Sequence, residues 1–405
     1  MTAGCTPGAR IATFLLTCIL AASALHVVRA QGAAGNNSLP AVPPEVVLRP
    51  DVVPYDLEAS HQKLDKTNQP FLREPALGPE SVFRRVLRFG KDTNNAVALI
   101  WDRPNGKLYF DLNRNLDLTD DPTGVFTATN KGHFTQYFTN VALPLKTAGG
   151  FYPAILNLRL SSDREGNYVQ AQLGSRILWQ AKVASGGAEW QVAVLDEVFD
   201  PQGPAAGKFL LLRPWAERTN YVSLRSGGSG LVPFPDQLFW VGQAFHLERR
   251  FDTGGEAPVC KLEFTPRQPP LTDLKLSGES VYYAVLGATN GYTVVMREPP
   301  GTVNIPKGIY AVNTVWLKKG EAKAWLQPEP PLVINATVAT NSSLGGPLTN
   351  LVILNRSGRK LQMYYQLRGA DGRAYRLAQV DRTKPPEFTV YRGGKKVLSG
   401  KFEFG

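Results

Sequence analysis

Residues 96–121 read AVALIWDRPNGKLYFDLNRNLDLTDD, and this stretch decides the fold class. Its two strand-like runs, Ala96–Trp101 and Lys107–Phe110, are separated by Arg103-Pro104-Asn105-Gly106. Asn-Gly between two such runs is typical of a β-hairpin turn. The second run leads directly into a segment with an oxygen-bearing side chain at every second position. The stretch therefore predicts a hairpin followed by an acidic loop.

The acidic loop carries six candidate ligands for a hard cation. Oxygen donors that alternate along a coiled loop can turn inward and replace water around Ca²⁺. The pattern D-x-[DN]-x-[DN]-G is matched at its first, third and fifth positions, but Leu116 replaces its glycine and Pro122 its closing carboxylate. The candidate Ca²⁺ ligands are Asp111, Asn113, Asn115, Asp117, Asp120 and Asp121. The same residues also fit a solvated turn, in which Asn and Asp side chains bond their own backbone.

Short strand-like runs continue on both sides of this stretch, with turn clusters after about every ten residues. Such spacing favours sandwiches and barrels over alternating strands and helices. We therefore predict a mainly β chain: a multi-domain body of β-sandwich or barrel-like architecture with a small C-terminal sandwich of Ig-like or transthyretin-like type. Residues 191–213 show the same order of a strand, an acidic segment (196–201) and a strand. This is either a degraded repeat of the arrangement around Asp111 or a coincidence.

The amino terminus has the features of a secretory signal. Arg10 precedes an apolar run from Ile11 to Leu25, which is short for a membrane span, and Val28-Arg29-Ala30 is an acceptable cleavage site. We expect an exported protein (periplasmic, cell-surface or secreted), with an uncleaved anchor as the alternative and no transmembrane segment after cleavage. Of the 3 cysteines, Cys260 alone lies outside the signal, in a strand-like run where a small buried hydrophobe is expected.

Composition shifts divide the chain into five expected parts. They are a signal (1–30), a Pro-rich linker and lead-in (31–70), a β-domain with the acidic loop (71–200), a second β-rich region (201–330) and a basic Ig-like sandwich (331–405). The last boundary rests on the proline break Gln327-Pro328-Glu329-Pro330-Pro331.

The positive charge is concentrated at the carboxyl end. The chain has a formal net charge of +11, and residues 351–405 hold twelve Lys and Arg against four Asp and Glu, hence +8. Such charge indicates an anionic partner, and for an exported chain we expect acidic polysaccharide or an envelope surface and no nucleic acid. The candidate polyanion-binding residues are Arg356, Lys360, Arg373, Arg376, Lys395 and Lys396. The alternative is a solvated basic face that complements an acidic neighbouring domain.

Three segments carry a loose resemblance to other proteins: Tyr109–Asp121, Leu210–Trp215 and Gly400–Gly405. Through them most of the chain outside the signal resembles a group of exported bacterial β-rich proteins, a resemblance that implies no activity. The acidic loop itself is similar to the DxNxN-type calcium loops of dockerin and EF-hand modules, without their glycine.

No sequence motif for catalysis stands out. The segment Ser226-Gly-Gly-Ser-Gly230 fails the G-x-S-x-G frame, and His61, His133 and His246 are isolated from one another. The function expected is therefore a non-catalytic exported binding or scaffold protein of the cell envelope, with a Ca²⁺-stabilised loop and a basic module for anionic surfaces. The alternatives are a β-rich carbohydrate-active hydrolase with paired carboxylates, and a purely structural envelope component. The sequence predicts no oligomeric state.

Overall fold

The computed structural model describes the chain between residues 41 and 402. The described residues are 41–66, 71–78, 82–91, 95–130, 132–147, 150–199, 205–222, 230–252, 258–326, 332–358, 360–377, 383 and 385–402. The signal predicted at 1–30 and the proline break at 327–331 lie outside them. Strands make up most of this part, whose helices are the short 3₁₀ turns η2 (Pro122–Gly124) and η3 (Trp215–Glu217). The prediction of a mainly β, sandwich-like chain is confirmed. No helix in the described ranges is long and apolar enough to cross a membrane.

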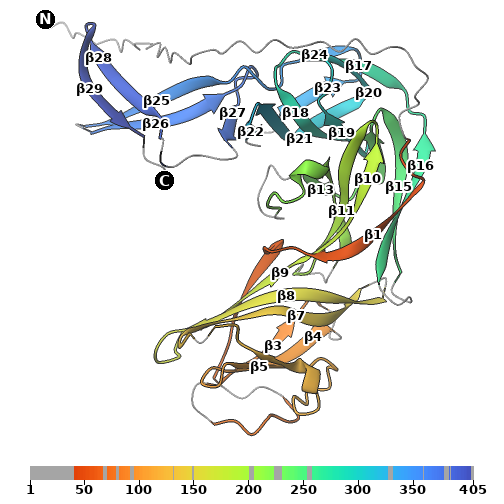
Figure 1. The fold of residues 1–405 in the computed structure, drawn as a ribbon, viewed down its shortest axis with the longest axis vertical. Helices are drawn as coiled ribbons and strands as arrows, with labels where there is room; N and C mark the ends of the chain where they lie inside the picture. The colour runs from red at the N-terminus through yellow and green to blue at the C-terminus, as the bar shows by residue number, and fades with distance from the viewer. Residues whose placement is uncertain are drawn as a thin grey trace, which may run out of the picture.

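The N-terminal lobe, residues 58–175, is a sandwich of two four-stranded antiparallel sheets. One sheet has the order β2-β9-β8-β7, with β2 Glu58–Lys63, β7 Thr135–Thr147, β8 Gly150–Ser162 and β9 Val169–Ser175. The other has the order β3-β4-β5-β6, with β3 Val82–Arg88, β4 Ala96–Asp102, β5 Lys107–Phe110 and β6 Val125–Thr127. Apolar side chains from both sheets form one buried core, in which Phe83 and Trp101 pack ring to ring at 5.3 Å. The lobe lies at the bottom of Figure 1.

A 16-stranded sheet runs through the rest of the molecule, and its order is β13-β12-β11-β10-β1-β16-β15-β14-β19-β18-β21-β22-β27-β26-β25, with β23 on β21. Its first half comprises β1 Glu45–Val52, β10 Ile177–Ser185, β11 Ala188–Glu197, β12 Ala205–Pro214, β13 Leu231–Pro233, β14 Gln237–Trp240, β15 Gln243–Asp252 and β16 Val259–Arg267. Its second half comprises β18 Val281–Ala288, β19 Tyr292–Arg297, β21 Gly308–Lys319, β22 Ala322–Leu326, β23 Leu332–Ala336, β25 Thr349–Ser357, β26 Lys360–Arg368 and β27 Ala374–Leu377. A small sheet, β20-β17-β24, covers the second half with β17 Leu271–Leu276, β20 Thr302–Pro306 and β24 Thr340–Ser342.

Two cores share the middle of the large sheet. On β14, Leu238 and Trp240 point into a central core, whereas Phe239 points into a distal core on the opposite face. On β18, Val285 and Leu286 are divided between the two cores in the same way. Because successive side chains of a strand alternate between faces, a strand that separates two cores is apolar at consecutive positions.

The linker expected at 31–70 is wrong for residues 45–52. These residues form β1, which pairs with β10 on one side and with β16 on the other, and Leu48 has no exposed surface. The alternation in Val46-Val47-Leu48 (buried, exposed, buried) is a strand signal that the neighbouring prolines obscured. β1 therefore joins two parts of the large sheet that are distant in sequence (red in Figure 1).

The lobes also divide the chain differently from the expected boundaries at 200 and 330. The N-terminal lobe ends at Ser175, and β11 pairs with β12 across residue 200. Residues 332–342 pair with β21 and β17, so they belong to the distal core. Beyond them, β25 to β27 extend the large sheet through β22, while β28 (Glu387–Arg392) and β29 (Lys395–Lys401) form a separate hairpin. The C-terminal strands thus form two parts: β25 to β27 continue the large sheet, and the β28–β29 hairpin is a separate two-stranded sheet.

Candidate functional site

The acidic loop begins after β5 and is folded around one buried carboxylate. Asp111 has no exposed surface, and its Oδ1 and Oδ2 accept hydrogen bonds from the backbone N–H groups of Asn115 (3.1 Å) and Leu116 (2.9 Å). Burial raises the pKa of Asp111, against the effect of these hydrogen bonds. Leu116 has a φ of 64°, the left-handed conformation for which the calcium-loop pattern uses glycine. The backbone turn of the pattern is therefore present despite the missing glycine.

The remaining side chains of the loop bond within the loop. Three of these side chains accept a hydrogen bond through Oδ1 from the backbone N–H two residues ahead. The distances are 3.0 Å for Asn113, 2.7 Å for Asn115 and 2.9 Å for Asp117. The side-chain nitrogens of Asn113 and Asn115 donate to Asp120, and Asp121 Oδ2 accepts from Leu112 N at 2.9 Å. The structure thus brings all six candidate ligands into one loop, and each makes hydrogen bonds there.

This arrangement matches a self-bonded turn, the alternative that the sequence left open. Amide nitrogens face Asp120, and nitrogen that carries hydrogen is no ligand for Ca²⁺. Among the described residues, no three His, Cys, Asp or Glu side chains lie together as a metal site. Ca²⁺ binding by this loop stays a prediction.

The second acidic segment holds the lobes together. Asp196 is buried and accepts from Trp179 Nε1 at 3.0 Å and from the backbone N–H of Gly207. Glu58 of β2 accepts from Val198 N at 2.8 Å, across the junction between the N-terminal lobe and the large sheet. These carboxylates satisfy buried N–H groups, which is a structural use.

The six candidate polyanion-binding residues fall into three places. Arg356 and Lys360 flank the turn between β25 and β26, and Lys395 and Lys396 follow the turn between β28 and β29. Arg373 and Arg376 lie elsewhere, at the start of β27 and on it, where Arg376 is opposite Trp325. Arg392, which is not among the six predicted residues, completes the second turn; its position beside Gly393-Gly394 is the sequence signal for it.

A buried charged network that the sequence did not reveal includes Arg213 of β12. Arg213 has no exposed surface; its Nε donates to Gln191 Oε1 at 2.6 Å and its Nη2 to the carbonyl of Arg218 at 2.9 Å. Burial lowers the pKa of Arg213. Nearby, Lys323 Nζ lies 2.7 Å from Oε1 of the buried Glu217. Arg213 lies in the segment Leu210–Trp215, which therefore serves packing.

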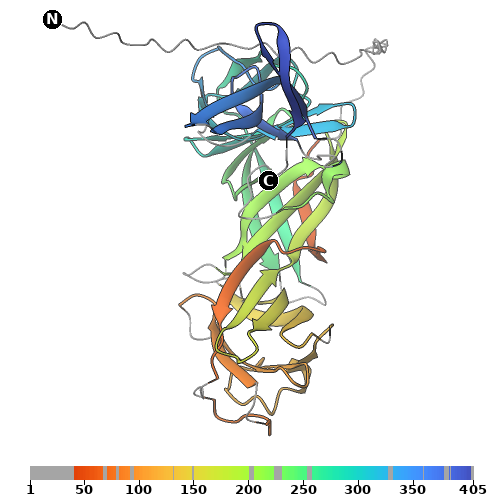
Figure 2. The ribbon, with the colours of Figure 1, turned by 90° about the vertical axis from the view of Figure 1, so that its left-hand side faces the viewer.

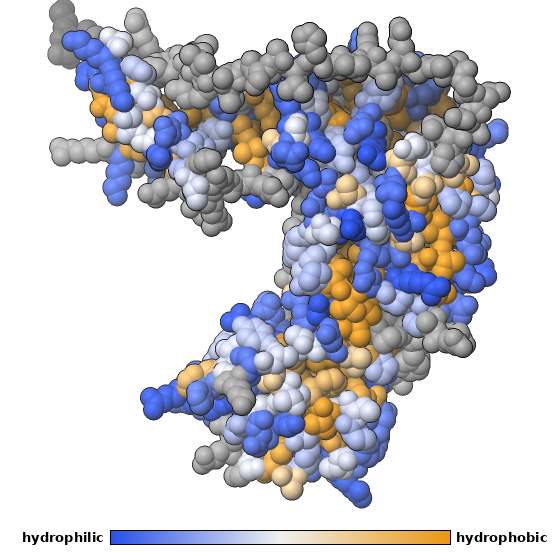
Figure 3. All heavy atoms as spheres, in the orientation of Figure 1, coloured by the Kyte–Doolittle hydropathy of each residue, from blue (hydrophilic) through white to orange (hydrophobic). Residues whose placement is uncertain are grey.

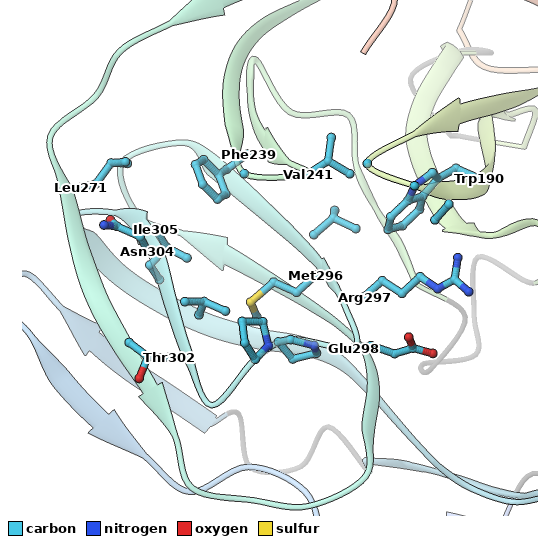
Figure 4. A pocket seen from close by; sticks show the side chains of 18 residues that line it. Trp190, Phe239, Val241, Leu271, Met296, Arg297, Glu298, Thr302, Asn304 and Ile305 are labelled. Carbon is cyan, nitrogen blue, oxygen red and sulfur yellow. The ribbon is translucent and has the colours of Figure 1, made fainter. Parts of the chain in front are cut away.

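A cavity of about 660 Å³ opens between the β10–β11 turn, the β14–β15 turn and the β19–β20 connection (Figure 4). Trp190, Phe239 and Met296 supply apolar surface, while Arg297 and Glu298 add charge. Val241 and Glu298 both have left-handed backbone, with φ of 46° and 43°, which costs energy for residues other than glycine.

A second hollow of about 240 Å³, on β7 to β9, includes Tyr137, Arg159 and Asp56. Each of the two hollows has one carboxylate in its lining, and hydrolysis by paired acids needs two.

Cys260 and His246 are the last two residues that the sequence singled out for chemistry. Cys260 is fully buried, and burial raises the pKa of its thiol to about 12, which confirms the prediction of a small buried hydrophobe. His246 contacts the carbonyl of Asp236 (2.9 Å) and Glu248 Oε1 (3.1 Å).

Comparisons of the chain with protein families, with curated proteins and with solved structures found no match.

Proposed function

We propose that this protein is a non-catalytic, exported binding or scaffold protein of the cell envelope that attaches to anionic surfaces through its C-terminal module (residues 349–405). The observation that carries the proposal is the separation of charge along the molecule. The module holds +8 of the net +11, and its two hairpins project from one end of the body (blue in Figure 1). The sequence alternative of an acidic neighbour is not favoured for these turns, because no ion pair among the described residues involves Arg356, Lys360, Lys395 or Lys396.

The junction between module and body supports a scaffold role. Tyr375 of β27 is buried in the distal core, and its hydroxyl accepts a hydrogen bond from Gly345 N at 3.1 Å. β27 also pairs with β22, so the module continues the large sheet. Because they share a sheet and a packed core, the module and the body form one rigid unit. A surface bound by the hairpins is therefore held at a fixed position relative to the body. In this proposal the acidic loop, with Ca²⁺ where it binds, stabilises the N-terminal lobe at the opposite end.

Salt-dependent retention on dextran sulfate tests the proposal. At 0.15 M salt the Debye length is about 8 Å, so binding through exposed charges should be mostly lost by roughly 0.5 M NaCl. The variant R356Q/K360Q/K395Q/K396Q should elute much earlier than wild type. The control K63Q/R88Q/K91Q/K275Q removes the same charge from exposed positions in the body and should be retained nearly as wild type. Equal losses in both variants would show that net charge, and not the module, is responsible, and would contradict the proposal.

A further inference from the structure

Two hairpin turns in the C-terminal module have the same residue pattern. Tip 1 (residues 354–361) reads LNRSGRKL, and tip 2 (residues 391–398) reads YRGGKKVL. Each has an apolar residue at both ends, glycine in the turn, three Lys or Arg and no Asp or Glu. Tip 1 joins β25 to β26 and tip 2 joins β28 to β29. The two tips come from different sheets, so the shared pattern is not one structural repeat.

The apolar residues of the tips are exposed. Leu361 and Val397, which directly follow the two basic pairs, are 53% and 57% exposed, and Leu398 is 54% exposed. Directly paired residues of antiparallel strands lie on the same face, and the registers pair Arg356 with Leu361 and Lys396 with Tyr391, so each tip carries basic and apolar side chains side by side. Apolar surface lies next to hydrophilic surface at this end of the molecule (Figure 3, upper left). Grouped apolar exposure of this kind marks an interaction surface.

The two tips are held at the same end of the molecule. One aromatic contact connects the hairpins, with Phe402 at 5.5 Å from Tyr365 of β26, and Phe402 also packs at 5.1 Å on Phe388 within the second hairpin, ring centre to ring centre. Figures 1 and 2 both show the hairpins together at one end, away from the N-terminal lobe. A flat partner can therefore contact both tips at once.

The chemistry of the tips selects one class of partner. A second copy of the chain would bring the same positive charge against each tip, which is unfavourable. A soluble acidic polysaccharide offers charge but no apolar layer for Leu361 and Val397. An anionic lipid leaflet offers both, phosphates at its surface and acyl chains just beneath.

We propose that the two tips bind anionic lipid membranes, with the basic side chains at the headgroups and the apolar ones at the acyl boundary. This inference rests on the proposed function and narrows its anionic surface to lipid. Each Lys or Arg near an anionic surface strengthens binding roughly fivefold, so the three of one tip contribute roughly 100-fold. The two rigidly joined tips bind the membrane more tightly together than either does alone. Once one tip is bound, the other is held at a high local concentration at the membrane surface.

Co-sedimentation of the full chain with vesicles tests the inference. Wild type should bind vesicles that contain phosphatidylglycerol and should not bind vesicles of phosphatidylcholine alone. The charge variant R392Q/K395Q/K396Q should bind roughly 100-fold more weakly, while K63Q/R88Q/K91Q should bind nearly as wild type. The apolar variant L361S/V397S keeps every charge and should lose at least several-fold in vesicle binding. Its retention on dextran sulfate should be unchanged, and a urea denaturation curve like that of wild type would show that it is folded.

The outcomes separate the two proposals. If L361S/V397S binds anionic vesicles as tightly as wild type, apolar contact plays no part and the lipid inference is overturned. If wild type is retained on dextran sulfate but does not bind anionic vesicles, the partner is a polysaccharide, and the proposed function stands without the inference. Binding of wild type to neither probe would overturn both.

Discussion

Lys323 Nζ lies 2.7 Å from Oε1 of Glu217, and this contact connects η3 to β22. Glu217 is 2% exposed, whereas about a third of the lysine side chain is accessible to solvent. The carboxylate also accepts from Asn220 Nδ2 at 2.5 Å. The ion pair therefore neutralises a charge that folding has removed from water.

Removal of the lysine should destabilise the protein more than removal of both partners. Lys323→Met leaves the buried carboxylate of Glu217 without its cation, which should cost about 1–3 kcal/mol in the free energy of unfolding. The double variant E217Q/K323M should recover part of that loss. Urea denaturation measures both. Lys319→Met, on the same hairpin but exposed, should change little. A double variant that is no more stable than Lys323→Met would contradict this account of the pair.

The Ca²⁺ prediction for the acidic loop is tested by thermal melting. A ligand that binds only the folded protein raises its melting temperature. Wild type should therefore melt higher in millimolar CaCl₂ than in EGTA, and Mg²⁺ should have a smaller effect, because the spacing of oxygen donors suits the larger ion. Asp120→Ala, at an exposed position, should abolish the difference. Asp371→Ala, in another Asx turn, should keep it. Identical curves for wild type in CaCl₂ and EGTA would refute Ca²⁺ binding and leave the self-bonded turn.

The reactivity of the Cys260 thiol should show whether the central core opens. Its pKa is raised to about 12 in the folded state, above about 8.5 for a free thiol. The thiolate is therefore disfavoured in the fold, and the contribution of this group to stability is lost as pH rises from about 8.5 towards 12. At pH 8 the thiol should resist iodoacetamide in native buffer and react rapidly in urea, as mass spectrometry would measure. Rapid labelling of the native protein would mean that β16 opens without global unfolding.

Backbone strain at Glu298 predicts a stabilising substitution. Its φ of 43° is unfavourable for glutamate, and asparagine tolerates this region better. Because the side chain is exposed, Glu298→Asn should raise the free energy of unfolding by about 0.5–1 kcal/mol. Glu321→Asn, exposed in the β21–β22 turn and without this strain, is the matched control and should not stabilise. Equal shifts of the denaturation midpoint for both variants would exclude strain as the cause.

Local patterns were sufficient for much of this protein. The hairpin around Asn105-Gly106, the loop from Asp111 to Asp121 and the basic C-terminal hairpins follow from alternation, turn chemistry and charge within short windows. These features depend on neighbours a few residues away, which the sequence displays directly. The left-handed Leu116 also belongs to this local level, because Asp111 bonds the N–H groups of that turn.

Tertiary structure alone decided which strands share a sheet and which residues share a core. β1 lies between β10 and β16, and β14 pairs in parallel with β19, contacts between residues far apart in sequence. The burial of Arg213 likewise depends on partners from other segments. Strand pairing uses backbone groups that every residue has, so a strand's sequence indicates its faces but not its neighbour. Only the simultaneous burial of all the cores selects the pairing, and with it the common end from which both tips project.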